Sequence, residues 1–547
     1  MDSSYTYLRA LSHNLNQALS SYERHIANTR AADLDLNLED PLGKRPNDSS
    51  RGMAEARWAC LNALDVLRAA LQSPVDAMYQ TQTSTAEMSA LGVIVRSGVV
   101  DAMYEEAGED ASTLARGVPV QTLANKSGIN PHKLARLLRL LAVRHWFREP
   151  TESVFRPTRF GAALRKGQPV AAYIAAHAST LFASMQELFN TLTDPDSRDS
   201  DSEHQTAFAR GPGQGKSYWE YLAEHPDVQR DFGLSMQASG EIQLAASLRE
   251  FPWRQRLQDK ILVDVGGGAG HFSVHFAKMD IPGLKIVVQD LPGTYELAQQ
   301  HFVKTVPDFV GAQRAEFEQG DFFKPNSRSG KNVCYLLRSI LHDWSDEHCV
   351  KILSSLAASM HPSSSIFVHD ALLRPCLPPN PALKPQLYQS SSTTSSFSPF
   401  SVMRRDSTTG SAGSHDSSHM GPAAAAPPFS RRDSLLSPPM SDAGADTDSE
   451  TCGAGAGAGG AGKTVAAEQE APWPLPRNFG PNASQVCGLD FLMLLELNGR
   501  ERTEAQIRSI ASRAGLELVH TTSLTSGRGI FEIRLPSSTS TSTSTLA

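Results

Sequence analysis

The chain has 547 residues, which is too long for one ordinary domain and predicts roughly two to four. Its net charge is −7 and its basic residues are scattered, which argues against an electrostatic surface for nucleic acid or for a membrane. The six cysteines include no Cys-x-x-Cys pair, which argues against structural zinc and favours a reducing compartment. Since we recognise no signal peptide and no stretch able to span a bilayer, the expected location is cytoplasmic.

Two stretches near the start of the chain, residues 5–27 and 53–72, carry apolar side chains at helical spacing. A polar segment that contains proline separates them. A helix with a single apolar stripe needs a partner surface. We therefore expect these N-terminal helices, within residues 1–75, to serve packing or self-association.

Residues 91–164 show the pattern of a short helix, a glycine-containing turn, a longer helix and two short strands, which is typical of a winged helix. If this module bound DNA, Lys133, Arg136 and Arg139 on the longer helix would contact the duplex. The acidic chain and the catalytic-looking domain that follows favour a second interpretation. This is a dimerisation domain over residues 76–170.

Helical spacing continues through residues 171–250, which we expect to form a connector or substrate lid, with Met236 in its core or, as the less favoured alternative, lining a pocket. Strands and helices then alternate, which predicts a parallel sheet with helices on both faces and ligands beyond the carboxyl ends of its strands. The expected strands are Ile261–Val265, Leu284–Gln289, Ala315–Glu318, Val333–Leu337 and Ile366–Leu372. Helices are expected to begin near Gly270, Thr294 and Ser345.

A glycine-rich turn, residues 266–270, follows the first of these strands and lets a ligand approach the backbone beside a helix N-terminus. The dinucleotide fingerprint G-x-G-x-x-G fits two of its glycines but has His271 in the third place. The methyltransferase pattern acid-x-G-x-G-x-G is met in full, by Asp264, Gly266, Gly268 and Gly270. Both classes need an acid about 20 residues later, and Asp290 supplies it without discriminating between them.

Five segments together carry a family resemblance: Val263–His271, Val288–Pro292, Gly320–Phe323, Tyr335–Asp346 and Asn498–Thr503. They resemble the cation-independent class I O-methyltransferases typified by caffeic-acid and flavonoid enzymes of plants and by sterigmatocystin-type enzymes of fungi. The resemblance implies an α/β, Rossmann-like methyltransferase domain over residues 251–375 and 473–536. Its sheet would be mostly parallel with an antiparallel last strand, and a helical, winged-helix dimerisation domain would precede it.

The resemblance also implies the cofactor and the roles of site residues. S-adenosylmethionine would be bound by Gly266, Gly268, Asp290, Asp321, Phe322 and Arg338. His342 would take the proton of a substrate hydroxyl, with Asp370 and Glu501 orienting its ring. Arg338 stands where many plant members have lysine, and Asp370 is shorter than the usual glutamate, so we expect its hydrogen bond to be longer or water-bridged.

These roles agree with the chemistry of the residues. A phenol has a pKa of about 10 and histidine one of about 6.5, so the proton acceptor must be held in place. A carboxylate on the far ring nitrogen fixes the tautomer and stabilises the imidazolium. The implied reaction is methyl transfer to a phenolic hydroxyl of an aromatic, polyketide- or flavonoid-like secondary metabolite by a homodimer. No metal is expected, because no residues show ligand spacing.

Alternatives stay open at several positions. We expect Asp343 to cap or brace the helix from Ser345, and Trp344 to pack, while Met493 is either core or substrate-facing. A non-catalytic S-adenosylmethionine-binding or regulatory protein would keep the same fold, but it would not need the acid-base residues His342, Asp370 and Glu501. A nicotinamide-dependent oxidoreductase is disfavoured by His271.

Between residues 376 and 472 the composition changes to Ser, Pro, Gly, Ala and Thr without apolar periodicity, which predicts a disordered insert. The motif Arg404–Ser407 recurs as Arg431–Ser434 and resembles sites of basic-directed kinases. Beyond the insert we expect helices and strands at Ser484–Leu497, Thr503–Ala514, Leu516–His520 and Gly529–Leu535. The tail, residues 537–547, is expected to be unfolded.

Overall fold

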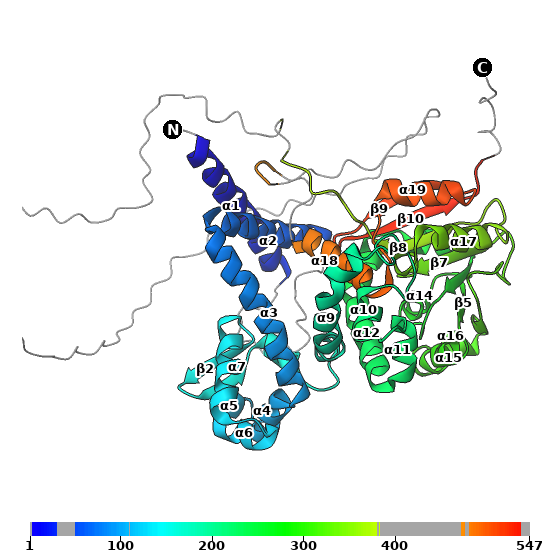
Figure 1. Cartoon of the computed structure of the whole chain (residues 1–547). Coiled ribbons are helices and arrows are strands. Elements are labelled where there is room, and N and C mark those ends of the chain that lie inside the picture. The colour runs from blue at the N-terminus through cyan, green and yellow to red at the C-terminus, as the bar shows by residue number, and fades with distance from the viewer. Residues whose placement is uncertain are drawn as a thin grey trace, which may run out of the picture. The chain divides into compact units, whose positions relative to one another are not determined.

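The computed structural model describes residues 3–29, 50–108, 110–379, 382, 472–475 and 481–537 (Figure 1). All of them belong to one compact unit, formed by residues 1–385 and 465–547. Most of the predicted insert, with both kinase-like motifs, and nearly all of the predicted tail lie outside the described residues.

The described part of the chain contains a seven-stranded sheet in the order β6-β5-β4-β7-β8-β10-β9. Its strands are β4 Ile261–Val265, β5 Lys285–Asp290, β6 Ala315–Gln319, β7 Val333–Arg338, β8 Ile366–Ala371, β9 Glu517–Ser523 and β10 Arg528–Arg534. The pairs among β4 to β8 are parallel, whereas β10 is antiparallel to both β8 and β9. This confirms the predicted fold class, a mostly parallel sheet with an antiparallel last strand.

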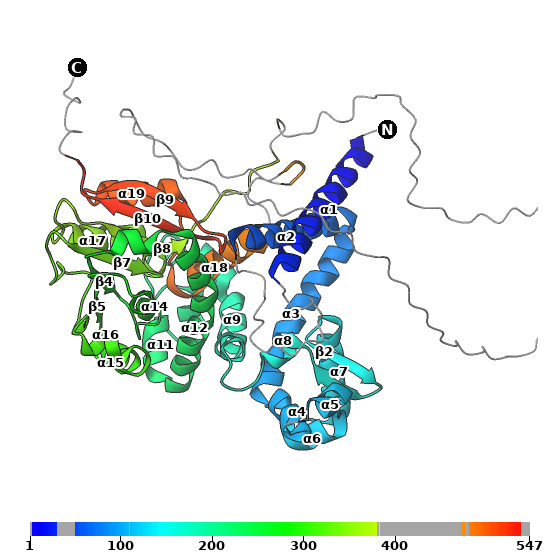
Figure 2. The ribbon, with the colours of Figure 1, turned by 180° about the vertical axis from the view of Figure 1, so that it is seen from behind.

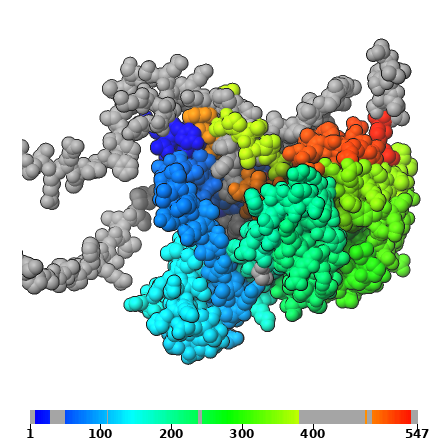
Figure 3. Space-filling model, viewed as in Figure 1, coloured from blue at the N-terminus to red at the C-terminus, as the bar shows by residue number. Residues whose placement is uncertain are grey.

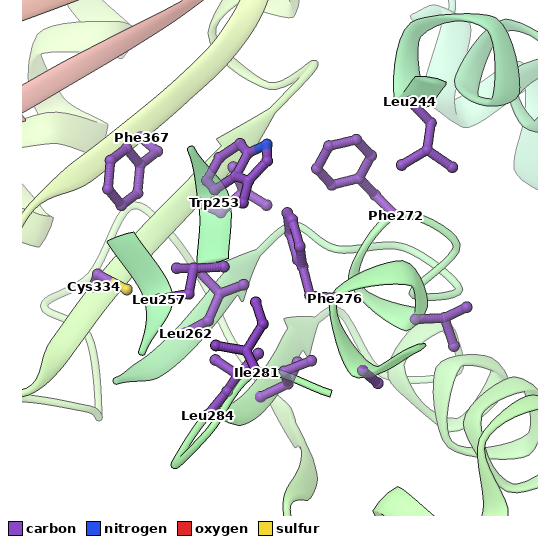
Figure 4. Packing of buried hydrophobic residues seen from close by; sticks show 14 of the residues in the cluster. Leu244, Trp253, Leu257, Leu262, Phe272, Phe276, Ile281, Leu284, Cys334 and Phe367 are labelled. Carbon is purple, nitrogen blue, oxygen red and sulfur yellow. The ribbon is translucent and has the colours of Figure 1, made fainter. Parts of the chain in front are cut away.

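Helices cover both faces of this sheet, as Figure 1 shows. They include α14 Ser273–Lys278, α15 Thr294–Thr305, α16 Pro307–Gly311, α17 Asp346–Ala357 and α19 Glu504–Arg513. Neighbouring residues of β4 enter different cores, because successive strand side chains point to opposite faces. Leu262 packs in a cluster with Trp253 and Phe276 (Figure 4), whereas Val263 packs with residues of α17 and α19. Burial on both faces explains why this strand is a continuous apolar run.

Two predicted helix starts are corrected by the backbone. The helix expected from Gly270 begins at Ser273, because Gly270 has a φ of +68°, which a right-handed helix does not allow. The helix near Ser345 begins at Asp346 with Ser345 as its cap, whose Oγ accepts the His348 N–H. Asp343 is therefore not the capping residue of that helix.

The two predicted N-terminal helices are present as α1 Ser3–Thr29 and α2 Arg51–Leu71, which pack on each other. The predicted winged-helix order follows, and its elements are α3 Pro74–Arg96, α4 Val99–Ala107, α5 Ala111–Arg116, β1 Val118–Pro119, α6 Val120–Ser127, α7 Pro131–Val143, β2 Phe147–Thr151 and β3 Val154–Pro157. Arg139, one of the three basic residues considered for DNA, is paired with Glu149 at 2.8 Å. That pairing gives no support to a DNA-binding role.

A group of helices lies between the winged helix and the sheet in the sequence. They are α8 Arg159–Ala162, α9 Pro169–Thr193, α10 Ala207–Arg210, α11 Tyr218–Glu224, α12 Pro226–Glu250 and α13 Trp253–Leu257. After the insert, α18 Pro481–Leu497 contacts α9, α10 and α2, and Figures 1 and 2 show it beside them. In the space-filling view the green surface of this helical group adjoins the yellow-green surface of the sheet domain (Figure 3). No described helix has the length and apolar character needed to cross a membrane.

Candidate active site

A cavity of about 1690 Å³ lies where the parallel strands β4, β5, β6 and β7 end. Most single-ligand pockets measure roughly 300–1,000 Å³, so this one has room for two molecules side by side. Its walls are the glycine-rich turn, the segments after β5, β6 and β7, and the helices α11, α12 and α18. A smaller cavity of about 320 Å³ beside Asn498 contains none of the predicted site residues.

The glycine-rich turn needs its glycines for space as well as for conformation. Gly266 and Gly268 have φ values of +68° and +56°, which side chains rarely adopt. A Cβ on Gly266 would lie 2.6 Å from Cδ1 of Ile340, and one on Gly267 would lie 2.8 Å from the Asp264 carboxylate. Beside Gly268, by contrast, there is open space. The turn therefore offers bare backbone to the cavity.

Asp290 ends β5 directly beside this turn. Its two carboxylate oxygens accept the backbone N–H groups of Gly268, at 2.8 Å, and Leu291, at 2.7 Å. Burial raises the pKa of Asp290, while both hydrogen bonds oppose that rise. An acid in this position is suited to a ribose hydroxyl pair, as predicted from the spacing.

The other predicted cofactor residues also line the cavity, but their side chains have partners of their own. Asp321 pairs with Lys324 at 2.9 Å and accepts the N–H of Phe323 at 3.0 Å. Phe322 packs edge-on against Trp344, which also lines the cavity. The guanidinium of Arg338 lies 5.0 Å above the ring of Phe272 and donates to Gln243 at 3.0 Å. Among the described residues its Nε is buried without a hydrogen-bond partner.

His342 lies in the short turn η1 Leu341–Asp343, and its side chain is buried at the cavity wall. Its Nδ1 is 2.7 Å from Oε1 of Glu501, and its Nε2 is 3.4 Å from Oδ1 of Asp343. Arg502 holds the turn by donating to the carbonyls of Leu341, at 2.7 Å, and Trp344, at 2.6 Å. The structure thus brings the predicted histidine and glutamate together.

The structure does not place Asp370 in direct contact with His342. Asp370 is buried on β8, and within the described part of the chain its Oδ1 has no hydrogen-bond partner. Its charge nevertheless contributes to raising the pKa of His342. The second carboxylate beside the ring belongs to Asp343, for which capping or bracing a helix was the favoured expectation. The sequence could not rank the two acids, because Asp343 is adjacent to His342 in the chain, whereas Asp370 lies on the next strand, β8, and its distance from the ring depends on packing.

Charges around His342 change its protonation. Burial lowers the pKa of His342, but the carboxylates of Asp343 and Glu501 outweigh burial and raise it to about 9. Burial raises the pKa of Asp343 to about 6. The two carboxylates therefore favour the charged form of the ring.

Sequence reasoning missed two buried ionisable residues of the cavity wall. Arg528, buried at the start of β10, donates to Oγ of Ser339 at 3.0 Å. Glu496 is buried on α18, near Met493, which also lines the cavity. An acid inside the apolar run Leu489–Leu497 was the available signal for Glu496. For Arg528 the sequence offered none, because a β-hairpin arginine is most often solvated.

The described residues contain no group of three or more His, Cys, Asp or Glu side chains arranged to hold a metal ion.

Comparison with known proteins identifies the family. A family model described as an O-methyltransferase domain matches residues 189–390. 4-O-methyltransferase 1 of Phanerochaete chrysosporium is 30% identical over 337 residues, covering 58% of this chain and 70% of that protein. O-methyltransferase xanE of Aspergillus fumigatus is 31% identical over 348 residues, covering 63% and 76%. The chain belongs to this O-methyltransferase family and is an S-adenosylmethionine-dependent O-methyltransferase.

Solved structures share the fold at low identity. The mitomycin 7-O-methyltransferase MmcR is 18% identical with a TM-score of 0.55, covering 86% of this chain and all of that one. A structure titled "A Pericyclic Reaction enzyme" is 17% identical with a TM-score of 0.57, covering 89% of this chain and 95% of that one. Because enzymes described so differently share one fold, the acceptor and the acid-base chemistry of this chain must be argued from the residues of its site.

Proposed function

We propose that this enzyme methylates a phenolic hydroxyl of an aromatic small molecule, with His342 as the general base and no metal. The observation that carries the proposal is the 2.7 Å contact between His342 Nδ1 and Glu501 at the wall of the cavity. Glu501 holds the ring so that Nε2 can receive the substrate proton. Asp343, 3.4 Å from Nε2, then stabilises the imidazolium. Glu501 and Asp343 are thus positioning residues, and Asp370 acts on the ring through its charge.

The chain's own residues fit the cofactor, S-adenosylmethionine, which supplies an electrophilic methyl group when bound. Open space beside the bare backbone of Gly268 admits a ligand closely, Gly266 lines the same cavity, and Asp290 provides carboxylate oxygens beside the turn. We assign Asp321, Phe322 and Arg338 to the same half of the cavity. The buried Arg338 Nε, which has no partner within the described residues, is suited to an anionic group.

We assign the part of the cavity with mainly apolar and aromatic walls to the acceptor. It is lined by Trp219, Phe232, Met236, Leu489, Leu492 and Met493. Met236, expected in the core, is 41% exposed and faces this space. Apolar and aromatic walls with few polar groups suit a planar aromatic acceptor, such as a polyketide- or flavonoid-like secondary metabolite.

The test is incubation with methyl-labelled S-adenosylmethionine and a panel of phenols. We expect label on a phenolic oxygen, and activity that survives excess EDTA. Loss of activity that magnesium restores would contradict the metal-free mechanism. If S-adenosylmethionine raises the melting temperature but no phenol is labelled, a non-catalytic S-adenosylmethionine-binding protein becomes the better interpretation. A cofactor at about 100 times its Kd stabilises the folded protein by about 2.7 kcal/mol, which is enough to raise the melting temperature.

We also propose a homodimer formed through the N-terminal elements. Leu64 and Leu71 on α2 and Met78 and Tyr79 on α3 are exposed apolar side chains, which supports a surface for a second copy. Light scattering tests this, and a monomer at micromolar concentration would contradict it.

The proposed cytoplasmic location is supported by the cysteines of the described segments, which are free thiols, as is usual for proteins in a reducing compartment.

Asp290→Ala should weaken cofactor binding about 10- to 100-fold, because a ribose hydroxyl pair loses its charged acceptor, worth about 1.5–3 kcal/mol. Isothermal titration with S-adenosylmethionine measures this. Asp308→Ala, an exposed acid of α16 outside the cavity, is the matched control. Unchanged affinity in Asp290→Ala would show that the acid at the end of β5 does not bind the cofactor.

Glu501→Gln should move the pH profile of kcat/KM. The pKa of His342 is raised to about 9 in the folded protein, above its unfolded value of about 6.5. The charged ring therefore stabilises the fold fully below about pH 6.5, and this stabilisation is lost as the pH rises through about 9. Catalysis needs the neutral ring, so activity should rise toward pH 9. Removing one of the carboxylates that raise this pKa should shift the inflection to lower pH, while Glu517→Gln, exposed on β9, should not. An unmoved inflection would assign the titration to another group.

A further inference from the structure

We propose that Glu496, Tyr218 and His177 form a polar subsite that binds a second hydroxyl group of the aromatic acceptor, apart from the oxygen that is methylated. The three side chains come from α18, α11 and α9, and all line the cavity. The inference rests on the proposed function, in which this half of the cavity holds the acceptor. It adds the substrate class, an aromatic compound with at least two hydroxyl groups.

Glu496 carries the argument. Its side chain is 2% exposed, and its Oε1 has no hydrogen-bond partner among the residues that the structure describes. The residues that share its helix face, Leu489, Leu492 and Met493, are apolar and cannot satisfy it. A buried polar atom without a partner costs about 1–3 kcal/mol. Such a carboxyl, aimed into a cavity, is suited to a ligand that donates a hydrogen bond.

Tyr218 presents a second unsatisfied group to the same space. Its hydroxyl is buried and has no partner within the described part of the chain. Its ring is held by edge-on contacts with Phe208, at 5.1 Å, and Phe232, at 5.7 Å, so the hydroxyl has little freedom to move toward another partner. Burial raises the pKa of Tyr218, and the nearby Glu496 charge raises it further, which links the two groups electrostatically. The phenol therefore stays protonated and can donate or accept.

His177 supplies an acceptor. Its Nδ1 lies 2.8 Å from the carbonyl oxygen of Tyr173, one helical turn earlier. Because a carbonyl only accepts, Nδ1 carries the proton of the neutral ring and Nε2 keeps its lone pair. The ring stacks on Tyr173 at 4.3 Å, and burial lowers the pKa of His177, which keeps it neutral.

Together these three side chains favour a ligand group that can donate a hydrogen bond over one that can only accept. The His177 Nε2 lone pair accepts, the Tyr218 hydroxyl both donates and accepts, and Glu496 offers carboxyl oxygens. Burial raises the pKa of Glu496 to about 8, so near neutral pH it is mostly the uncharged acid, which also donates and accepts. A hydroxyl, which has one hydrogen to donate and lone pairs to accept with, matches this set. An unsubstituted ring would leave these groups unsatisfied, and a methoxy oxygen, which can only accept, would leave the His177 Nε2 lone pair without a donor.

The experiment uses the full chain loaded with S-adenosylhomocysteine and compares dihydroxynaphthalene isomers with 1- and 2-naphthol by isothermal titration. We expect at least one dihydroxy isomer to bind about 10-fold or more tightly than either naphthol. Glu496→Leu, whose side chain neither donates nor accepts a hydrogen bond, and Tyr218→Phe should each remove most of that preference while leaving naphthol affinity within about 3-fold. Glu517→Leu and Tyr79→Phe, exposed on β9 and α3, are the matched controls.

A second measurement separates binding from a structural role. Glu496→Leu should raise the melting temperature of the ligand-free protein, because it removes an unsatisfied buried carboxyl; a structural role would lower it. A wild type without preference for a second hydroxyl, or variants that keep it, would overturn the subsite. If the preference is present but no label is ever transferred, the subsite stands and the proposed methylation fails. If label moves to naphthols and diols equally well, the subsite alone fails.

Discussion

His342→Gln is expected to lower methyl transfer to a phenol by about 10²–10⁴-fold, the usual worth of a general base, with cofactor affinity within a few-fold of wild type. Glutamine fills similar space but cannot take up a proton. The ring is held through Glu501 and η1, not through the glycine-rich turn, so the cofactor half of the cavity should be unaffected. Single-turnover transfer of labelled methyl and cofactor titration measure the two quantities separately.

The matched control is His520→Gln, an exposed histidine on β9 far along the chain from η1. It should transfer methyl at the wild-type rate. Equal rates in His342→Gln and wild type would remove His342 from the mechanism. They would direct attention to the other buried titratable groups around the cavity.

Gly499→Ala should lower both stability and activity. A Cβ at Gly499 would lie 2.2 Å from the carbonyl oxygen of His342 and 2.9 Å from the carbonyl carbon of Asp343. Both neighbours are backbone atoms, so one segment must move. The N–H of Arg500 donates to the same His342 carbonyl at 2.8 Å, and the next residue is Glu501. Displacement would therefore also separate the carboxylate from the ring.

We expect Gly499→Ala to cost about 1–3 kcal/mol or more, the range for overpacking, and to lower turnover at least about 10-fold. Urea unfolding and labelled methyl transfer measure these effects. Gly488→Ala in α18 is the control, because a Cβ there meets nothing within 4 Å and alanine favours a helix by about 0.5–1 kcal/mol. A Gly499→Ala protein with normal turnover would show that the 498–502 segment does not position the histidine.

The sequence by itself determined the local elements and the chemistry they carry. Apolar runs with strand spacing located β4, β5, β7 and β8 to within about two residues, because burial on both faces leaves a pattern that a short stretch shows alone. The motif spacing likewise located the glycine-rich turn and Asp290, and the family resemblance pointed to His342 and Glu501. In each case the information is in neighbouring residues.

Only the tertiary structure decided which of these groups meet. His342 and Glu501 are 159 residues apart, and their contact depends on how α18, η1 and the segment after α18 pack together. The same packing places Asp343, rather than Asp370, beside the ring. It also buries Glu496 without a partner, although its sequence context shows only an acid in an apolar helix. Periodicity reports which face of an element is buried, but a hydrogen bond depends on distances between elements, and those are set by the packing of the whole domain.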